Sequence, residues 1–228
     1  MNSWRAILPL GLRVSLRRFQ RRLWNAAHRE ATARARISRP EAFPHVVARH
    51  ESRLIRSVPQ EMRPLQHSKI RNLELGCARM DRLLIERGEV FSFCALIGRT
   101  SYRRGFVDGL EMHAGRLVGA PGGGLCQLAN LIFWMGLHLD LDILERHRHE
   151  LDLFPDDGRS VPFGMGASVF YNYRDLRLRN HLSQPLVLRV GVRPPRLWGT
   201  VLSDRPLPFR VEIIERSHRF FRGSEGKV

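Results

Sequence analysis

The spacing of apolar residues predicts a long helix in the first half of the chain, over residues 68–86. Apolar residues recur there at intervals of three and four, which places them on one face of a helix. The stripe consists of Ile70, Leu73, Cys77, Met80 and Leu84. We therefore expect a helix that buries the Cys77 thiol in the core and is closed by Gly88.

A second helix is predicted directly after a run of glycines. Pro121 and the three glycines at 122–124 interrupt regular structure. The residues that follow, from 125 to 135, are mostly apolar, and the run is long enough for a buried helix. We expect this helix to begin at about Cys126.

The remaining pattern predicts strands. Residues 90–94 have strand character, and so does the segment 145–153, in which alternation would put His147 and His149 on one face. Further strand-like segments, punctuated by proline and glycine, cover residues 168–173, 176–179, 186–192, 198–202 and 209–214. This order predicts an α+β fold: N-terminal helices, a glycine loop leading into a buried helix, and a mainly antiparallel sheet from the C-terminal half.

The beginning of the chain differs from the rest. Residues 1–40 hold ten arginines and a single acid, Glu30, and therefore carry +9 of the net charge of +16. Apolar residues at helical spacing lie between the arginines and predict a basic amphipathic helix. These residues are Leu12, Leu16, Phe19 and Leu23. Such a helix either lies on an anionic membrane surface or packs on the protein itself with its arginines towards water.

We expect three parts in the chain: this arginine-rich segment at 1–40, one domain over residues 41–221, and a tail at 222–228. The high charge does not by itself indicate nucleic-acid binding, because no stacking-aromatic or recognition-helix motif accompanies it. No apolar run reaches 18 residues, so we expect no membrane span, and we find no signal peptide. We expect a cytoplasmic protein that residues 1–38 could hold at the inner membrane face.

Three cysteines, Cys77, Cys94 and Cys126, are an odd number at wide spacing. This pattern is not typical of a disulfide scaffold or of a CxxC metal site, and it fits a reducing compartment. A His-x-His pair with Cys126 could ligate zinc, but a clear fourth ligand is lacking. We therefore expect no metal and no cofactor.

Cys126 is the candidate nucleophile because a helix N-terminus favours a thiolate. The preceding glycines would bring backbone N–H groups close enough to stabilise the oxyanion of an acyl intermediate. A glycine turn that leads into a buried helix with a core cysteine is the structural alternative. Spacing alone does not choose a base among the histidines of the chain.

Several spaced motifs resemble the VanW family. They include GGGLCQLAN at 122–130, ERHRH at 145–149 and YNYRDLRLRN at 171–180, and the similarity covers roughly residues 45–221. Some members of that family are regarded as L,D-transpeptidases, which crosslink peptidoglycan through the cysteine of the GGGxCQ motif.

The resemblance implies a role for each motif residue in a cysteine-dependent acyltransferase that acts on peptidoglycan peptides or precursors. Cys126 would be the nucleophile and His149 the base, closer to the sulfur than His147. Asp175 would orient a base or a substrate amine, and Arg146 would bind a substrate carboxylate. The other substrate-binding candidates are Gly122, Gly123, Gly124, Gln127, His147 and Asn180. The alternative is a non-catalytic accessory protein that binds a peptidoglycan precursor or a protein partner.

Overall fold

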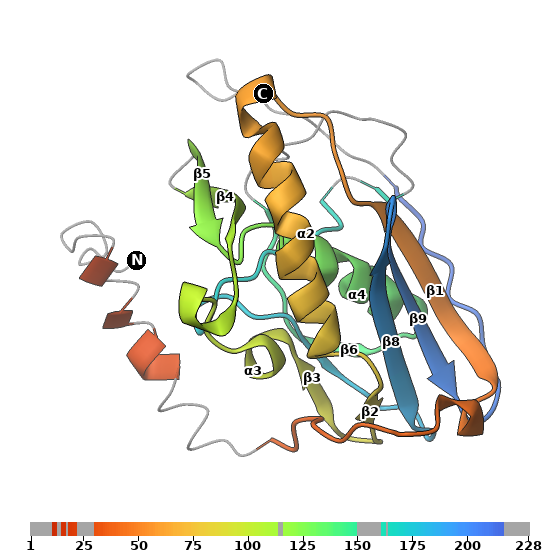
Figure 1. Ribbon diagram of the computed structural model, residues 1–228. Helices are drawn as coiled ribbons and strands as arrows, with labels where there is room; N and C mark the ends of the chain where they lie inside the picture. The colour runs from red at the N-terminus through yellow and green to blue at the C-terminus, as the bar shows by residue number, and fades with distance from the viewer. Residues whose placement is uncertain are drawn as a thin grey trace.

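The α+β prediction is confirmed by the computed structural model (Figure 1). The structure describes residues 11–12, 15–16, 18–21, 30–113, 116–149, 161–162 and 164–216. In this part of the chain the named strands pair antiparallel in three sheets, ordered β1-β9-β8-β2, β3-β7-β6 and β4-β5. The helices and strands, in chain order, are η2 (Pro40–Ala42), β1 (His45–Arg53), η3 (Gln60–Met62), α2 (Arg63–Ala78), β2 (Leu83–Ile85), β3 (Val90–Ser92), α3 (Phe93–Ile97), η4 (Tyr102–Arg104), β4 (Asp108–His113), β5 (Arg116–Pro121), α4 (Cys126–His138), β6 (Asp142–Glu145), β7 (Arg177–Arg179), β8 (Leu186–Arg193) and β9 (Arg196–Ser203).

The core lies between the four-stranded sheet and the two long helices. α2 packs against β8, and α4 packs against β1 and β9 (Figure 1). Gly199 of β9 leaves room for Leu131 and Met135 of α4, because a Cβ at this position would lie within 2.6 Å of both side chains. Close approach of α4 to the sheet therefore requires glycine at 199. This packing fixes the direction in which the N-terminus of α4 points.

The helix predicted after the glycine run is confirmed. α4 begins at Cys126, as expected, and ends at His138. The side chains of α4 that are fully buried include Leu128, Leu131 and Phe133. An apolar run of this length, buried against a sheet, is stable as a helix because packing adds to its backbone hydrogen bonds.

The helix predicted over 68–86 is shorter than expected and lies earlier in the chain. α2 spans Arg63–Ala78, and the chain then turns through Arg82, whose φ of 63° is in the left-handed region. Residues 83–85 form β2 and pair with β8. Met80 and Leu83 are fully buried, but they reach the core from a turn and a strand. Helical spacing persists past the end of α2 because these residues fill the same core.

Two strand predictions change at their ends. Residues 90–92 form β3, but Cys94 lies in α3, because the Ser92 hydroxyl accepts the Ala95 N–H at 3.2 Å and caps that helix. β6 ends at Glu145, where the segment 145–153 was predicted to begin. Residues 146–149 are not in a strand, and 150–160 lie outside the described residues. His147 and His149 are therefore not held on one face by strand alternation.

The last third of the chain confirms three of the five predicted strands. β7, β8 and β9 correspond to segments 176–179, 186–192 and 198–202. Residues 168–173 contribute only an isolated bridge between Phe170 and Arg174, and 209–214 form no strand. Residues 168–173 instead run between the two candidate sites described below.

The described residues of the arginine-rich segment are helical at 11–12, 15–16 and 18–21. Leu12, Leu16 and Phe19 are 53%, 38% and 57% exposed, whereas the Arg18 guanidinium stacks over the Phe170 ring at 5.0 Å. The apolar side chains are thus turned away from the domain. Leu23 lies outside the described residues.

Residues 30–37 lie against the domain. Thr32 bridges to Val90 and Arg36 to Leu83, and Ala33 between them is fully buried. None of the helices in the described residues has both the length and the apolar character needed to cross a membrane.

Candidate functional site

Cys126 occupies the first position of α4, and its side chain is half-buried. The thiol donates a hydrogen bond to the carbonyl of Val169, with the sulfur 3.8 Å from the oxygen. Burial raises the pKa of the Cys126 thiol, and Glu111 adds to this effect, whereas the Val169 backbone and Arg174 oppose it. The helix N-terminus alone therefore does not give a thiolate at neutral pH, and a nucleophilic Cys126 needs a base.

The glycines before Cys126 are required by close packing. Gly124 has a φ of 90°, and a Cβ there would lie 2.7 Å from Cβ of Lys69 on α2. A Cβ at Gly123 would overlap the carbonyl of Gly109. The loop therefore sits directly on α2 and on the start of β4, and only glycine fits.

Hydrogen bonds within the fold already use part of this loop. The Gly122 N–H donates to the Val107 carbonyl at 3.1 Å, and the Gly123 N–H donates to the Ala120 carbonyl at 2.9 Å. The Gly123 carbonyl in turn accepts a hydrogen bond from the side-chain amide of Asn72 at 2.9 Å. Oxyanion stabilisation by the amides of Gly122 and Gly123 would require these bonds to break. The N–H groups of Leu125 and Gln127 are also used, because they donate to the carbonyls of Gly122 at 3.3 Å and Gly124 at 3.0 Å. The candidate oxyanion donors are therefore the amides of Gly124 and Cys126.

His149 lies over the first turns of α4. A Cβ at Gly166 would be 2.8 Å from Cδ2 of His149 and 3.3 Å from Oδ1 of Asn130. Asn130 is one helical turn after Cys126, and its Oδ1 accepts the N–H of Ala167 at 2.7 Å. His149 therefore lies near the second turn of α4, one helical turn after Cys126, and it is an exposed residue.

His147 faces a different group. Its Nε2 lies 2.9 Å from Oε1 of Glu145. Glu145 also accepts the N–H of Asp175 at 3.0 Å and forms an ion pair with Arg21. Burial alone would raise the pKa of Glu145, but Arg21, His147 and the Asp175 amide together lower it. His147 therefore belongs to a half-buried polar network with Glu145, Arg21 and Asp175, whereas His149 lies beside Gly166.

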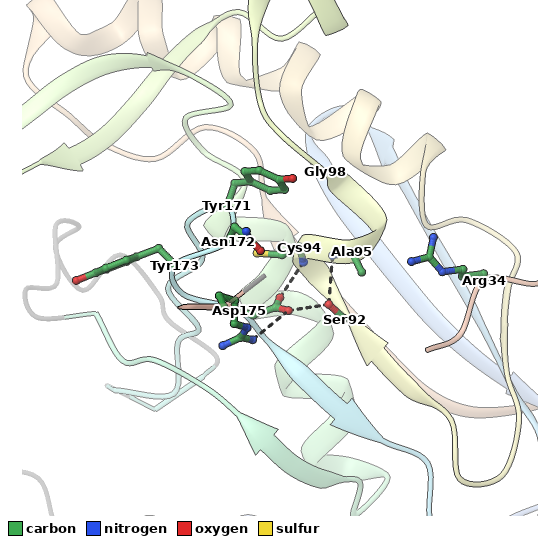
Figure 2. A pocket seen from close by; sticks show the side chains of 10 residues that line it. Arg34, Ser92, Cys94, Ala95, Gly98, Tyr171, Asn172, Tyr173 and Asp175 are labelled. Carbon is green, nitrogen blue, oxygen red and sulfur yellow. Dashed lines mark hydrogen bonds and ion pairs between the residues drawn. The ribbon is translucent and has the colours of Figure 1, made fainter. Parts of the chain in front are cut away.

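Asp175 lies at the bottom of a second polar site (Figure 2). It is buried, and it accepts hydrogen bonds from the Ser92 hydroxyl at 2.6 Å and the Cys94 N–H at 2.8 Å. Burial raises the pKa of Asp175, although Ser92 and the Cys94 amide oppose this effect. These bonds attach Asp175 to the start of α3.

A cavity of about 250 Å³ opens beside Asp175. Its lining consists of Arg21, Arg34, Ser92, Cys94, Ala95, Gly98, Tyr171, Asn172, Tyr173 and Asp175 (Figure 2). The Cys94 thiol donates to the carbonyl of Arg174 at 3.5 Å, and its pKa is raised well above the usual value, chiefly by burial. Cys94 is not among the site residues predicted from the sequence, and the structure places it in the wall of a cavity.

One segment separates the two sites. The carbonyl of Val169 contacts the Cys126 thiol, and the carbonyl of the next residue, Phe170, lies 3.8 Å from the Cys94 sulfur. The segment then reaches Asp175. Cys126 thus lies on one side of this segment, and Asp175 lies with Cys94 on the other side. His149 is near Asn130, one helical turn after Cys126.

The other candidates have mainly structural contacts. The Arg146 guanidinium stacks on Phe133 at 4.6 Å and donates to the carbonyl of Gly166 at 2.9 Å. The Gln127 amide nitrogen donates to the Ser52 hydroxyl at 2.9 Å, which ties α4 to β1. Arg146 therefore lies near His149 but is engaged with backbone carbonyls.

Asn180, predicted to bind substrate, is instead fully buried. Its side chain donates to the carbonyls of Ile85 and Gln184, both at 3.0 Å, and accepts the N–H of Leu182 at 3.1 Å. These bonds fix the turn before β8.

Three residues that were not predicted from the sequence lie beside the candidates: Asn130 beside His149, Glu145 beside His147 and Lys69 beside Gly124. Asn130 and Glu145 lie inside the motifs GGGLCQLAN and ERHRH, so the motifs could have indicated them. Lys69 gave no signal except its rarity, because only one other lysine, Lys227, occurs in the chain. Among the described residues, no group of three or more His, Cys, Asp or Glu side chains is arranged to hold a metal ion.

This arrangement, an α+β domain with a cysteine at the start of a buried helix after a glycine loop, can be compared with known proteins. The model of the family "VanW like protein" matches residues 68–202, more than half of the chain. The chain therefore belongs to the VanW-like protein family. No solved structure matches the chain significantly.

Two curated proteins are similar to the chain. It is 32% identical over 161 residues to the vancomycin B-type resistance protein VanW of Enterococcus faecalis, a match that covers 71% of this chain and 58% of that protein. It is 26% identical over 153 residues to the uncharacterized protein YoaR of Bacillus subtilis, covering 66% of this chain and 48% of that protein. The chain thus spans about half the length of these relatives.

Proposed function

We propose that this protein is a cysteine-dependent acyltransferase of the L,D-transpeptidase type that acts on peptidoglycan peptides or their precursors. The observation that carries the proposal is the position of Cys126 at the first residue of α4, directly after the glycine loop. The position of His149 beside Gly166, which also lies close to Asn130 of the same helix, supports His149 as the base. The similarity to a vancomycin resistance protein supports a role in glycopeptide resistance or cell-wall maintenance.

The chemistry follows from the raised pKa of the Cys126 thiol. A protonated thiol is a weak nucleophile, so His149 would take its proton as the sulfur attacks the carbonyl carbon of the acyl donor. The tetrahedral intermediate would place its oxyanion towards the amides of Gly124 and Cys126. When the C–N bond breaks, the proton returns from His149 to the leaving amine. An acceptor amine then attacks the thioester, the C–S bond breaks, and the proton lost by the amine passes through His149 to the Cys126 sulfur.

The test is intact-mass analysis after incubation with a tetrapeptide-stem muropeptide. The expected result is a mass increase equal to the acyl fragment in the native chain and none in Cys126→Ser. His149→Ala should suppress the adduct, whereas His147→Ala, the matched control two residues away, should retain most of it. Loss of the adduct in His147→Ala but not in His149→Ala would contradict the assignment of the base.

A second candidate is a non-catalytic protein that binds a peptidoglycan precursor or a protein partner at the same surface. The observation in its favour is that burial raises the pKa of Cys126. In this case Cys126→Ser should bind the muropeptide as tightly as the native chain does, and neither should form an adduct. Adduct formation on Cys126 would exclude this alternative.

The proposal also places the protein on the cytoplasmic side of the membrane, where it would meet precursors. The exposed Leu12, Leu16 and Phe19, with Arg18 turned to the domain, support a peripheral contact with an anionic membrane surface.

A further inference from the structure

An unusual group of buried polar side chains lies where α2 meets the start of α4. Gln66 is 1% exposed and Lys69 is 3% exposed. Both amide atoms of Gln66 and the Oε1 atom of Gln127 are buried without a hydrogen-bond partner. Buried polar atoms in native proteins are nearly always paired, and an unpaired one is destabilising. These atoms therefore need polar partners from outside the chain.

These side chains lie close together. Gln66 and Lys69 are three residues apart on α2, so they share a face of the helix. The stem of Lys69 passes Gly124, since a Cβ there would lie within 3.2 Å of three of its carbons. Gln127 is in the first turn of α4, three residues after Gly124. Lys69 thus lies against the loop that leads into α4, and Gln127 lies in the first turn of that helix, where its amide nitrogen donates to Ser52 of β1.

The charges in this place are positive. Burial, and after it the charge of Arg56, lower the pKa of Lys69 to about 8. The N-terminus of α4 adds a partial positive charge of about half an elementary unit. Gln66 offers its amide nitrogen as a donor and its Oε1 atom as an acceptor, and Gln127 offers its Oε1 atom as an acceptor, because its amide nitrogen already donates to Ser52. The positive charges and the donor suit an anionic group, and the acceptors suit the N–H of an amide attached to it.

We propose that Lys69, Arg56, Gln66 and Gln127 form a subsite for the carboxylate end of a peptide. The carboxylate would accept hydrogen bonds from Lys69 and from the Gln66 amide nitrogen. The adjoining peptide N–H would donate to the Oε1 atom of Gln66 or Gln127. Arg56 and Gln127 are half-buried, so the peptide enters from their side, with Lys69 and Gln66 at the bottom.

This inference rests on the proposed function for the peptide nature of the ligand, and it needs no turnover at Cys126. The subsite and Cys126 lie at the same end of α4, because Lys69 packs against Gly124, two residues before Cys126. A peptide anchored by its carboxylate at Lys69 would therefore present an upstream carbonyl to the thiol. The subsite would set which carbonyl is attacked.

The chain itself offers a sharp experiment, because Lys69 and Lys227 are its two lysines. Lysine labelled with 13C at Cε gives one NMR signal for each, and its shift follows the ammonium titration. N-acetyl-D-alanyl-D-alanine should raise the pKa of Lys69 by about 1–3, since a nearby anion favours the charged form. Lys227 serves as the internal reference and should not change. The same peptide with a C-terminal amide should leave both lysines unchanged.

Variants separate the subsite from the rest of the proposal. Lys69→Met should weaken binding of the carboxylate peptide about tenfold or more, because the buried charge is lost. Gln66→Leu, which keeps the charge, should weaken it less, and Lys227→Met should not affect it. Cys126→Ser should bind normally, so a failure of acyl transfer would leave this subsite intact.

Three results would overturn the inference. The first is equal binding of the carboxylate and amide peptides, and the second is an unchanged pKa of Lys69 at saturating peptide. The third is a response of Lys69 to inorganic phosphate but not to the peptide, which would make this a phosphate site.

Discussion

Replacement of Lys69 by methionine should make the free protein more stable at neutral pH. The Lys69 ammonium is buried, and its pKa falls from the usual 10.5 to about 8 because burial penalises the charge. The difference of about 2.5 between the two pKa values corresponds to a free-energy penalty on the charged native state on the order of 3 kcal/mol, at roughly 1.4 kcal/mol for each pKa unit. Methionine retains an unbranched stem of similar length that can still lie along Gly124, without the charge.

The sign of the pH dependence follows from proton binding in the two states. Below pH 8 the native and unfolded chains both hold the proton, so the native state carries the full penalty. Between pH 8 and pH 10.5 the unfolded chain keeps a proton that the native chain has lost, so native stability rises with pH. The advantage of Lys69→Met should therefore be largest below pH 8 and should disappear by pH 10.5.

The assay is urea unfolding of the native protein and of Lys69→Met, monitored by circular dichroism at pH values of roughly 7, 8, 9 and 10, which span the range of the two pKa values. Lys227→Met is the control and should show no difference from the native chain. A difference between native and Lys69→Met that does not change with pH would refute the assignment of the charge penalty to Lys69. A variant less stable than the native chain at every pH would show that the ammonium is paired.

Two further predictions concern thiols and membranes. Iodoacetamide should modify Cys126 before Cys77, because the Cys77 thiol is buried and has a pKa of about 12, and the rate at Cys126 should still rise above pH 9. Mass mapping after quenching measures both rates, and equal protection of the two thiols would contradict a nucleophilic role. The full chain should sediment with anionic vesicles at low salt, and substitution of Leu12, Leu16 and Phe19 by serine should abolish this; sedimentation unchanged by the substitutions would attribute binding to charge alone.

The parts of the fold that could be predicted are those with one dominant local cause. α4 was found at its true start because the glycines before Cys126 exclude a helix and the apolar run after it fits no exposed element. Strands such as β8 and β9 were found because apolar residues recur in them between proline and glycine breaks. In each case the local pattern and the tertiary packing favour the same structure.

The errors arise where two structures share one pattern. Met80 and Leu84 continue the spacing of α2, yet the first lies in a turn and the second in β2, because the sheet offers Leu84 a pairing partner in β8. His147 and His149 differ for a similar reason. His147 contacts Glu145, whereas His149 lies beside Gly166, because residues 146–149 do not form the strand that alternation assumes.

The glycines of the motif are required for close packing, which is a different reason from the one that the sequence suggested. The sequence predicts that they expose amides to an oxyanion, yet the amides of Gly122 and Gly123 donate to carbonyls of the fold. Gly123 must be glycine because the backbone of Gly109 lies against it, and Gly124 because the stem of Lys69 does. Substitution of Gly124 would therefore displace Lys69 first, and any loss of peptide binding in such a variant would report on the lysine subsite before it reported on the thiol.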